Sequence, residues 1–427
     1  MSEPAKRREV VAWSLFDTAN SAFFLVVVTA MYPFFFRDAV LGGDIARGDL
    51  WWGRMLSLSA VLVACTAPYM GALAESKRWR KRLLAAYTAV AVMGTASLGF
   101  GASIPPLAAA ACFVLANAAT EGGMVFYASL LPSVSSPSTI GRISGIGWAV
   151  GYLGSIACLV VAAFGIGDPQ PATFVWVAGW FGFFSLPLFL MVRDRSPAVI
   201  NKAGAWQGLK SATQAAWKTR DLRRFLIAYF IYNDAVTTTI GFAALFASDE
   251  LGFPQQLLIL MIIGVQVTGA IGALGFGFVA DRLGTVRSIL LTLVIWIVIS
   301  LSSFALAVDF GFWSDDLMTL GPLGALTLRQ LLFLFVGLSV GFAMGAVQSQ
   351  SRTLLATMVP KHRTAEFFGL YAVCGRFSAV LGPLIFGWLS VTTGSKAMSV
   401  LALAVMFVIG AALMLGVDED RGRRELL

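Results

Sequence analysis

The chain has 427 residues, of which 58% are hydrophobic and only 13% are charged, with a formal net charge of +8. This composition excludes an ordinary soluble globular protein, in which about 25% of residues are charged, and it indicates a protein that spans a membrane. The positive charge does not indicate a nucleic-acid partner, because the basic residues lie in short breaks between apolar runs and form no basic domain.

Apolar runs long enough to cross a hydrocarbon core of about 30 Å follow one another along the chain. They are continuously apolar and do not alternate with period two, which favours helices over the strands of a barrel. We therefore expect an all-α membrane protein with twelve transmembrane helices. The expected spans are 10–36, 50–74, 83–103, 105–131, 142–166, 173–192, 224–248, 256–280, 288–308, 329–352, 366–391 and 396–416.

The distribution of basic residues predicts the orientation of these spans. If the N-terminus is cytoplasmic, most of the 31 Lys and Arg residues fall on the cytoplasmic side. The opposite side then holds only Arg37, Arg47, Arg329 and Lys396. By the positive-inside rule, both termini are expected in the cytoplasm.

The longest break divides the spans six and six. We expect a six-helix bundle over 1–192, a basic cytoplasmic linker over 193–223, and a second bundle with a short cytoplasmic tail over 224–427. The halves share sequence features, since FDTANS in the first span has a counterpart, YNDAVT, in the seventh. Such an internal repeat predicts two pseudo-symmetric bundles.

A short motif follows the second span of each half: a glycine, three residues, an acidic residue and then basic residues. This pattern resembles the loop signature of the major facilitator superfamily, and the resemblance implies a role in gating. The first copy has Ser76 and Arg78 where the pattern prefers a basic residue and a glycine. The gating candidates are Gly71, Glu75, Gly277, Asp281, Arg282 and Gly284.

Four longer stretches narrow the resemblance: WSLFDTANSAFF (13–24), FYASLLPSVSSPSTIGRISGIGWAVGYLGS (126–155), YNDAVTTTIGF (232–242) and AEFFGLYAVCGRFSAVLGPLIFGWLS (365–390). Together they are similar to the autophagy-type vacuolar effluxer branch of the superfamily, also called the "unknown major facilitator" family. The resemblance covers nearly the whole chain and implies a transporter with the major facilitator fold. Fungal members are linked to amino-acid efflux. The iron-related facilitators of bacterial magnetosome membranes are a more distant alternative.

Five charged residues lie within expected spans and not at a span end, where each costs about 2.5 to 3.5 kcal/mol and therefore faces protein or water. They are Asp17, Arg54, Glu121, Asp234 and Arg376. Expected spans 3, 6, 9 and 12 hold no such charge, as the peripheral helices of a major facilitator fold should. Glu121, Asp234 and Arg376 each lie roughly 15 Å from the cytoplasmic end of their span, near the midplane.

Two roles are open for each of these charges. Glu121 and Asp234 either bind a proton or cation during transport, or form a permanent ion pair with Arg376. The planar guanidinium of Arg376 either binds a substrate carboxylate or phosphate, or holds a carboxylate of the protein. Arg54 either lines the cavity or extends to the nearby membrane surface.

Further polar residues complete the candidate site. Asp17 and Asn20 lie on one helix, and Asn117 precedes Glu121 by one turn. Asn233 precedes Asp234, and Gln348 and Arg352 lie on the tenth span. These side chains either line the cavity or form hydrogen bonds between helices.

We expect a secondary transporter that moves a small solute by alternating access, coupled to a proton or cation. The solute is an amino acid or related organic compound; an iron or divalent-metal transporter and a transport-inactive scaffold or sensor are the alternatives. The sequence has no phosphate-binding glycine loop, nucleophile elbow or paired metal-ligand motif, so we expect neither an enzyme nor a cofactor. The expected setting is the bacterial cytoplasmic (inner) membrane or one derived from it, with the protein as a monomer.

Overall fold

The computed structural model describes residues 6–162, 171–195, 204–253, 255–308, 317–319, 325–378 and 381–426. The apolar runs form long helices, because a helix satisfies its backbone hydrogen bonds internally where water is absent. Eleven helical segments in the described ranges are long and apolar enough to cross a membrane. α10 (Arg220–Leu251), with 32 residues, packs among them as a further long helix. The all-helical fold predicted from the sequence is confirmed.

The first half begins with a continuous helical segment made of α1 (Arg7–Ala22), η1 (Phe23–Met31), α2 (Tyr32–Phe35) and η2 (Phe36–Val40), in which η1 and η2 are π-helical. The other helices of this half are α3 (Ile45–Lys77), α4 (Arg80–Ser97) with the 3₁₀ turn η3 (Leu98–Ser103), α5 (Pro106–Ser129), α6 (Leu131–Val134), α7 (Ile140–Val160) and α8 (Pro171–Met191). α9 (Ala205–Lys218) lies within the predicted linker.

The second half holds α10, α11 (Gln255–Leu283), α12 (Thr285–Ala307), α13 (Leu328–Met358), α14 (Thr364–Phe377), α15 (Leu381–Thr393), α16 (Lys396–Met414) and α17 (Glu419–Leu426). Two short strands, β1 (Leu317–Thr319) and β2 (Ala325–Thr327), pair antiparallel before α13. The expected span 366–391 corresponds to α14 and α15, which together belong to one candidate span, Thr364–Thr393. α13 continues six residues beyond the expected end of its span.

Corresponding helices of the two halves have corresponding neighbours. In the first half α1 packs on α8, α3 on α5, and α4 on both α5 and α8. In the second half α10 packs on α16, α11 on α13, and α12 on both α13 and α16. The peripheral helices α4, α8, α12 and α16 make their main contacts within their own half. This pattern is the pseudo-symmetry that the repeated motifs predicted.

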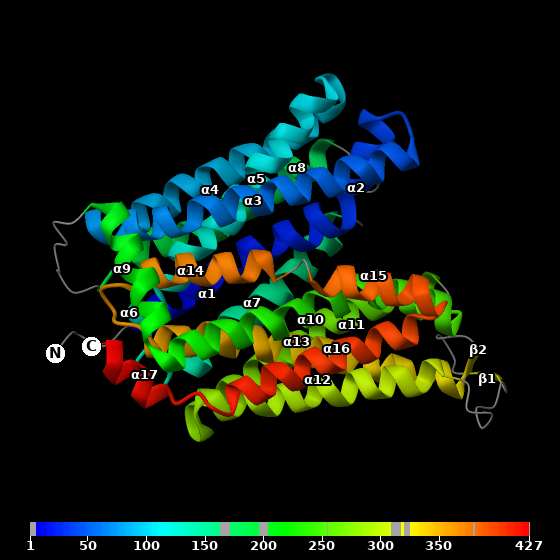
Figure 1. Ribbon diagram of the computed structural model, residues 1–427. Coiled ribbons are helices and arrows are strands. Elements are labelled where there is room, and N and C mark those ends of the chain that lie inside the picture. The colour runs from blue at the N-terminus through cyan, green and yellow to red at the C-terminus, as the bar shows by residue number, and fades with distance from the viewer. Residues whose placement is uncertain are drawn as a thin grey trace.

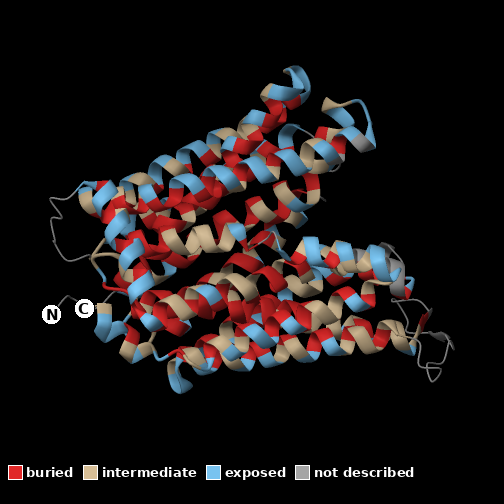
Figure 2. Ribbon diagram, in the orientation of Figure 1, coloured by how far each residue is buried: buried red, intermediate tan, exposed pale blue. Residues whose placement is uncertain are grey.

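The halves meet at one end and separate toward the other (Figure 1). The end where they meet also holds α9, α17 and the start of α1, and we call it the terminal end; the opposite end, with β1 and β2, is the far end. α14 packs against α3 and α5 of the first half, whereas α15, its continuation toward the far end, packs mainly on α16 and α10. Buried residues fill the terminal end, and α15 is largely exposed (Figure 2).

An ion pair closes each half at the terminal end. Arg195, just after α8, contacts Glu9 near the start of α1 with an N–O distance of 2.7 Å. Arg421 in α17 holds Asp221 near the start of α10 through two hydrogen bonds of 2.6 Å. Each pair joins the beginning of one half to its end, so that each half forms a closed bundle.

Candidate functional site

An ion pair between Glu121 and Arg376 joins the two halves at mid-depth. Arg376 Nη1 lies 2.6 Å from Glu121 Oε1, which brings α14 against α5. The Glu121 side chain is 8% exposed, whereas that of Arg376 is 36% exposed. Asn117 lies one turn before Glu121 on the same face of α5. Of the two carboxylates considered as partners of Arg376, the structure pairs it with Glu121.

Two buried oxygens at this ion pair have no hydrogen-bond partner among the described residues. They are Oε2 of Glu121 and Oδ1 of Asn117; Oδ1 of Asn20, on α1, is likewise without a partner. A buried acceptor without a donor costs about 1 to 3 kcal/mol, so such groups are normally satisfied by a ligand, a proton or water. The site therefore combines one partly accessible cation with acceptors that can bind a donor group.

Arg352 forms a second contact between the halves, on the terminal side of Arg376. Its Nη1 lies 3.3 Å from Asp17 Oδ2, and its Nη2 donates to the Ser144 carbonyl at 2.8 Å. The Tyr127 hydroxyl donates to the same Asp17 oxygen at 2.6 Å. The guanidinium also lies over Trp13, with its carbon 4.9 Å from the ring centroid. Of its two predicted roles, Arg352 therefore has the one that connects helices.

Asp234 and Asn233 connect α10 to both α14 and α15. Asp234 Oδ2 accepts from the Gly382 N–H at 2.8 Å, in the first turn of α15. Asn233 Nδ2 donates to the hydroxyl of Ser378, the last described residue of the α14 side, at 2.6 Å. The exposed N–H groups of a helix N-terminus carry partial positive charge, which the carboxylate of Asp234 satisfies.

The two remaining candidates, Gln348 and Arg54, lie apart from each other. Gln348 Oε1 accepts from the Tyr152 hydroxyl at 2.8 Å, which adds a hydrogen bond between α13 and α7. Arg54 is exposed, near the start of α3 and away from its terminal end at Lys77, and no contact with Arg376 is found among the described residues. The structure thus brings Asn117, Glu121 and Arg376 together.

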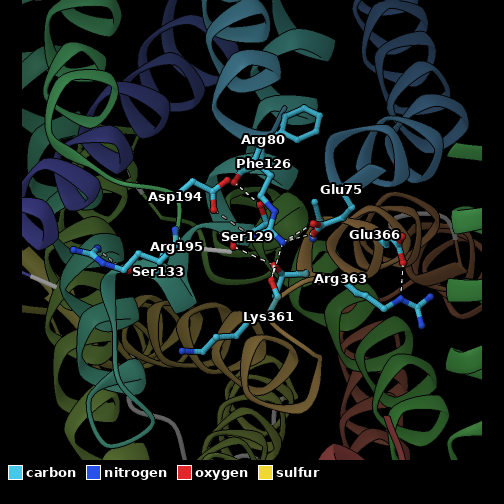
Figure 3. Close-up of polar contacts among 12 residues, drawn as sticks. Glu75, Arg80, Phe126, Ser129, Ser133, Asp194, Arg195, Lys361, Arg363 and Glu366 are labelled. Carbon is cyan, nitrogen blue, oxygen red and sulfur yellow. Dashed lines mark hydrogen bonds and ion pairs between the residues drawn. The ribbon is translucent and has the colours of Figure 1, made fainter. Parts of the chain in front are cut away.

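The first loop motif joins α3 to α14 at the terminal end (Figure 3). Glu75 Oε1 accepts from the Ala365 N–H, in the first turn of α14, at 2.6 Å. Arg80 donates to Glu75 Oε2 at 2.6 Å and to the Lys361 carbonyl at 2.8 Å. Glu75 therefore binds the N-terminus of a helix from the opposite half, where a negative charge is favourable.

The second motif makes the symmetry-related contact, between α11 and the start of α7. Asp281 Oδ1 accepts from the Gly141 N–H at 2.9 Å, and Oδ2 from the Arg142 N–H at 3.1 Å, at the start of α7. Arg282 is exposed, and Gly284 has a φ of +89° at the start of α12, a conformation that favours glycine. The pairing of α11 with α7 thus repeats that of α3 with α14.

The motif glycines permit these helices to approach closely. A Cβ atom on Gly71 would overlap the Ala365 carbonyl oxygen, and one on Gly277 would lie 2.9 Å from the Gly141 carbonyl oxygen. Both contacts are with backbone of the opposite half and cannot be relieved by side-chain movement. A larger residue would force the halves apart at the terminal end.

His362 lies in the loop between α13 and α14, next to the contact of Arg80 with Lys361. Burial, Arg363 and Arg80 lower the pKa of His362 below its ordinary value, because each disfavours the charged imidazolium. Arg363 itself bonds to Glu366 Oε2 at 2.8 Å. This histidine lies in a basic loop of the sequence, and the structure half-buries it among arginines.

Comparison with known sequences relates the chain to membrane transporters. A family model described as "Vacuole effluxer Atg22 like" matches residues 54–427. The uncharacterized MFS-type transporter YxiO of Bacillus subtilis (strain 168) is 26% identical over 96% of this chain and 94% of its own length. Autophagy-related protein 22-1 of Penicillium rubens is 28% identical over 66% of this chain, and the match spans 50% of that longer protein.

Solved structures share the fold at low sequence identity. The human organic anion transporter MFSD10 (TETRAN) matches with a TM-score of 0.73 and 15% identity, over 96% of this chain and 100% of that one. A bacterial homologue of the iron transporter ferroportin in its outward-facing state matches with a TM-score of 0.70 and 13% identity, over 96% and 98% of the two chains. These structures establish the fold, and the family model establishes membership of the family. The chain is an integral membrane protein of the major facilitator type and belongs to the vacuole effluxer Atg22-like family.

Proposed function

We propose that this protein is a secondary transporter in which the bundles 1–192 and 224–427 rock about the Glu121–Arg376 pair, joined by the linker 193–223. The positive-inside rule supports placing the terminal end in the cytoplasm of a bacterial cell, with both termini on that side. In that orientation the described conformation is closed to the cytoplasm and faces outward. Rocking then breaks the contacts of Glu75, Asp281 and Arg352 and closes the far end.

The substrate we propose is a small organic solute with a carboxylate, such as an amino acid. The observation that carries this proposal is the partly exposed guanidinium of Arg376, which can bind a carboxylate through two parallel hydrogen bonds. The unpartnered oxygens of Glu121 and Asn117 can accept hydrogen bonds from an ammonium group. A zwitterion would satisfy both sets of groups at once.

Glu121 is the proposed coupling residue. Protonation of its carboxylate removes the charge that holds Arg376, so the guanidinium becomes free to bind the substrate carboxylate. Deprotonation restores the ion pair and favours substrate release. Binding of proton and substrate would in this way be linked through one arginine, as coupled transport requires.

A ligand screen by thermal shift tests the substrate class, because a ligand that binds only the folded state raises its apparent stability. Purified protein is screened against amino acids, dipeptides, organic anions, Fe²⁺ and Mn²⁺. We expect an amino acid or organic acid to raise the melting temperature of the wild type and of Arg54→Gln, but not that of Arg376→Ala. A metal ion as the only active ligand would instead favour a divalent-metal transporter. No shift with any ligand, in protein that is folded, would favour the scaffold.

A further inference from the structure

A basic hollow of about 310 Å³ lies at the terminal end of α3 and α4, apart from the midplane site. Its lining consists of Lys77, Arg78, Trp79, Arg82 and Asp194. α3 ends here because Arg78 adopts a left-handed conformation, with a φ of 56°. The chain then turns at once into α4, which brings three basic side chains to one small region.

The hollow has three basic side chains and one carboxylate in its lining, so its lining carries a net positive charge. Its one carboxylate, Asp194, lies 3.8 Å from Nη1 of the buried Arg80, which uses its other nitrogen for Glu75 (Figure 3). In the described part of the chain, no ion pair is found for Lys77, Arg78 or Arg82, and all three are exposed. Like charges held this close repel each other, so a bound anion would stabilise the turn.

The neighbouring α9 indicates that the hollow lies at the depth of lipid headgroups. α9 packs across α3 and α14 with its small residues, among them Gly208 and Ala212. Its Trp206 and Trp217 are 71% and 67% exposed. Exposed tryptophans at the end of a transmembrane bundle are typical of the membrane interface, where the apolar ring and its polar N–H are both satisfied.

We propose that the hollow formed by Lys77, Arg78, Trp79 and Arg82 binds the phosphate group of an anionic membrane lipid. Guanidinium groups bind phosphate oxygens through charge-assisted hydrogen bonds, and Trp79 contacts the glycerol and upper acyl region. The lipid headgroup supplies the phosphate at high local concentration, which a soluble anion does not. This inference depends on insertion into a membrane and not on the identity of any transported solute.

Thermal-shift titration of the purified full-length protein tests the proposal. The probes are dioleoyl-phosphatidylglycerol, dioleoyl-phosphatidylcholine and the soluble headgroup analogue glycerol 3-phosphate. The test variant is Arg78→Gln/Arg82→Gln, and the matched control is Arg423→Gln/Arg424→Gln, which removes the same charge from exposed positions of α17 at the terminal end. Lys77→Gln serves as a milder variant if the double variant does not fold.

We expect only the anionic lipid to raise the melting temperature of the wild type. Each basic residue near an anionic headgroup contributes about fivefold in affinity, so the titration midpoint should rise roughly 25-fold in the test variant and about fivefold in Lys77→Gln. The control should stay within about twofold of the wild type. Equal losses in both double variants, or no selectivity for the anionic lipid, would overturn the proposal. Equal potency of glycerol 3-phosphate would show a soluble-phosphate site instead.

Discussion

Arg352 is a deeply buried charge that connects the halves, and its environment explains why it is tolerated there. Three aromatic rings lie around its guanidinium, those of Trp13, Tyr127 and Trp148. Asp17 balances its charge, and Ser144 accepts two of its N–H groups. Removing one partner of such a pair leaves a buried charge without compensation, which costs more than the pair itself contributes.

Asp17→Asn should therefore lower the free energy of unfolding by about 3 to 5 kcal/mol. The measurement is the melting temperature in detergent, with exposed Arg54→Gln as the control expected to change stability by less than about 0.5 kcal/mol. Combining Asp17→Asn with Arg352→Gln should recover part of the loss, because no charge is then left alone. A double variant as unstable as the sum of the single variants would contradict the pairing.

The lowered pKa of His362 predicts that the stability of the folded protein depends on pH. Because its pKa is lowered in the folded protein, the folded state binds fewer protons than the unfolded state once the pH falls below about 6.5. Stability should therefore decrease as the pH falls from about 7.5 to about 5.5, and His362→Gln should reduce that decrease. Melting temperatures across this range provide the measurement. Identical pH profiles for the two proteins would exclude His362 as a cause.

At the scale of the helices, the close approach of α11 to α7 keeps the terminal end closed. Gly277→Ala places a methyl group 2.9 Å from the Gly141 carbonyl oxygen, whereas no atom lies within 4 Å of the position that a methyl group on Gly275 would occupy. Overpacking of this kind costs about 1 to 3 kcal/mol. Gly277→Ala should thus lower the melting temperature and weaken the closed end, while Gly275→Ala leaves both unchanged. Equal effects would show that close approach is not the reason for the glycine.

The contact between Asp234 and the first turn of α15 can be tested by substitution. Asp234→Asn keeps an oxygen that accepts from Gly382 N–H, so it should retain the fold and the pH dependence of transport. Asp234→Ala removes the acceptor and should lower stability by about 1 to 3 kcal/mol. Uptake measured against pH, together with melting temperatures, checks both expectations. Loss of the pH dependence in Asp234→Asn alone would make Asp234 the coupling residue in place of Glu121.

For the protein as a whole, the sequence predicted most of the fold, because apolar length and repeated motifs are local signals. The repeat at Glu75 and Asp281 also predicted two related loops. The partners of charged side chains could not be predicted, since they depend on which helix faces cross in space. Two carboxylates on different helices were possible partners for Arg376. Arg352 lay at the end of an expected span, whereas the helix in the structure continues beyond it.

If Arg376 and Glu121 form a transport site between two moving halves, substrate exchange should depend on both. Counterflow of a radiolabelled amino-acid mixture in proteoliposomes measures this exchange without assuming a direction. We predict accumulation by the wild type and by Arg54→Gln, strong loss in Arg376→Ala, and transport in Glu121→Gln that no longer changes with pH. Wild-type accumulation no greater than that of empty liposomes, or undiminished transport in Arg376→Ala, would rule out this site.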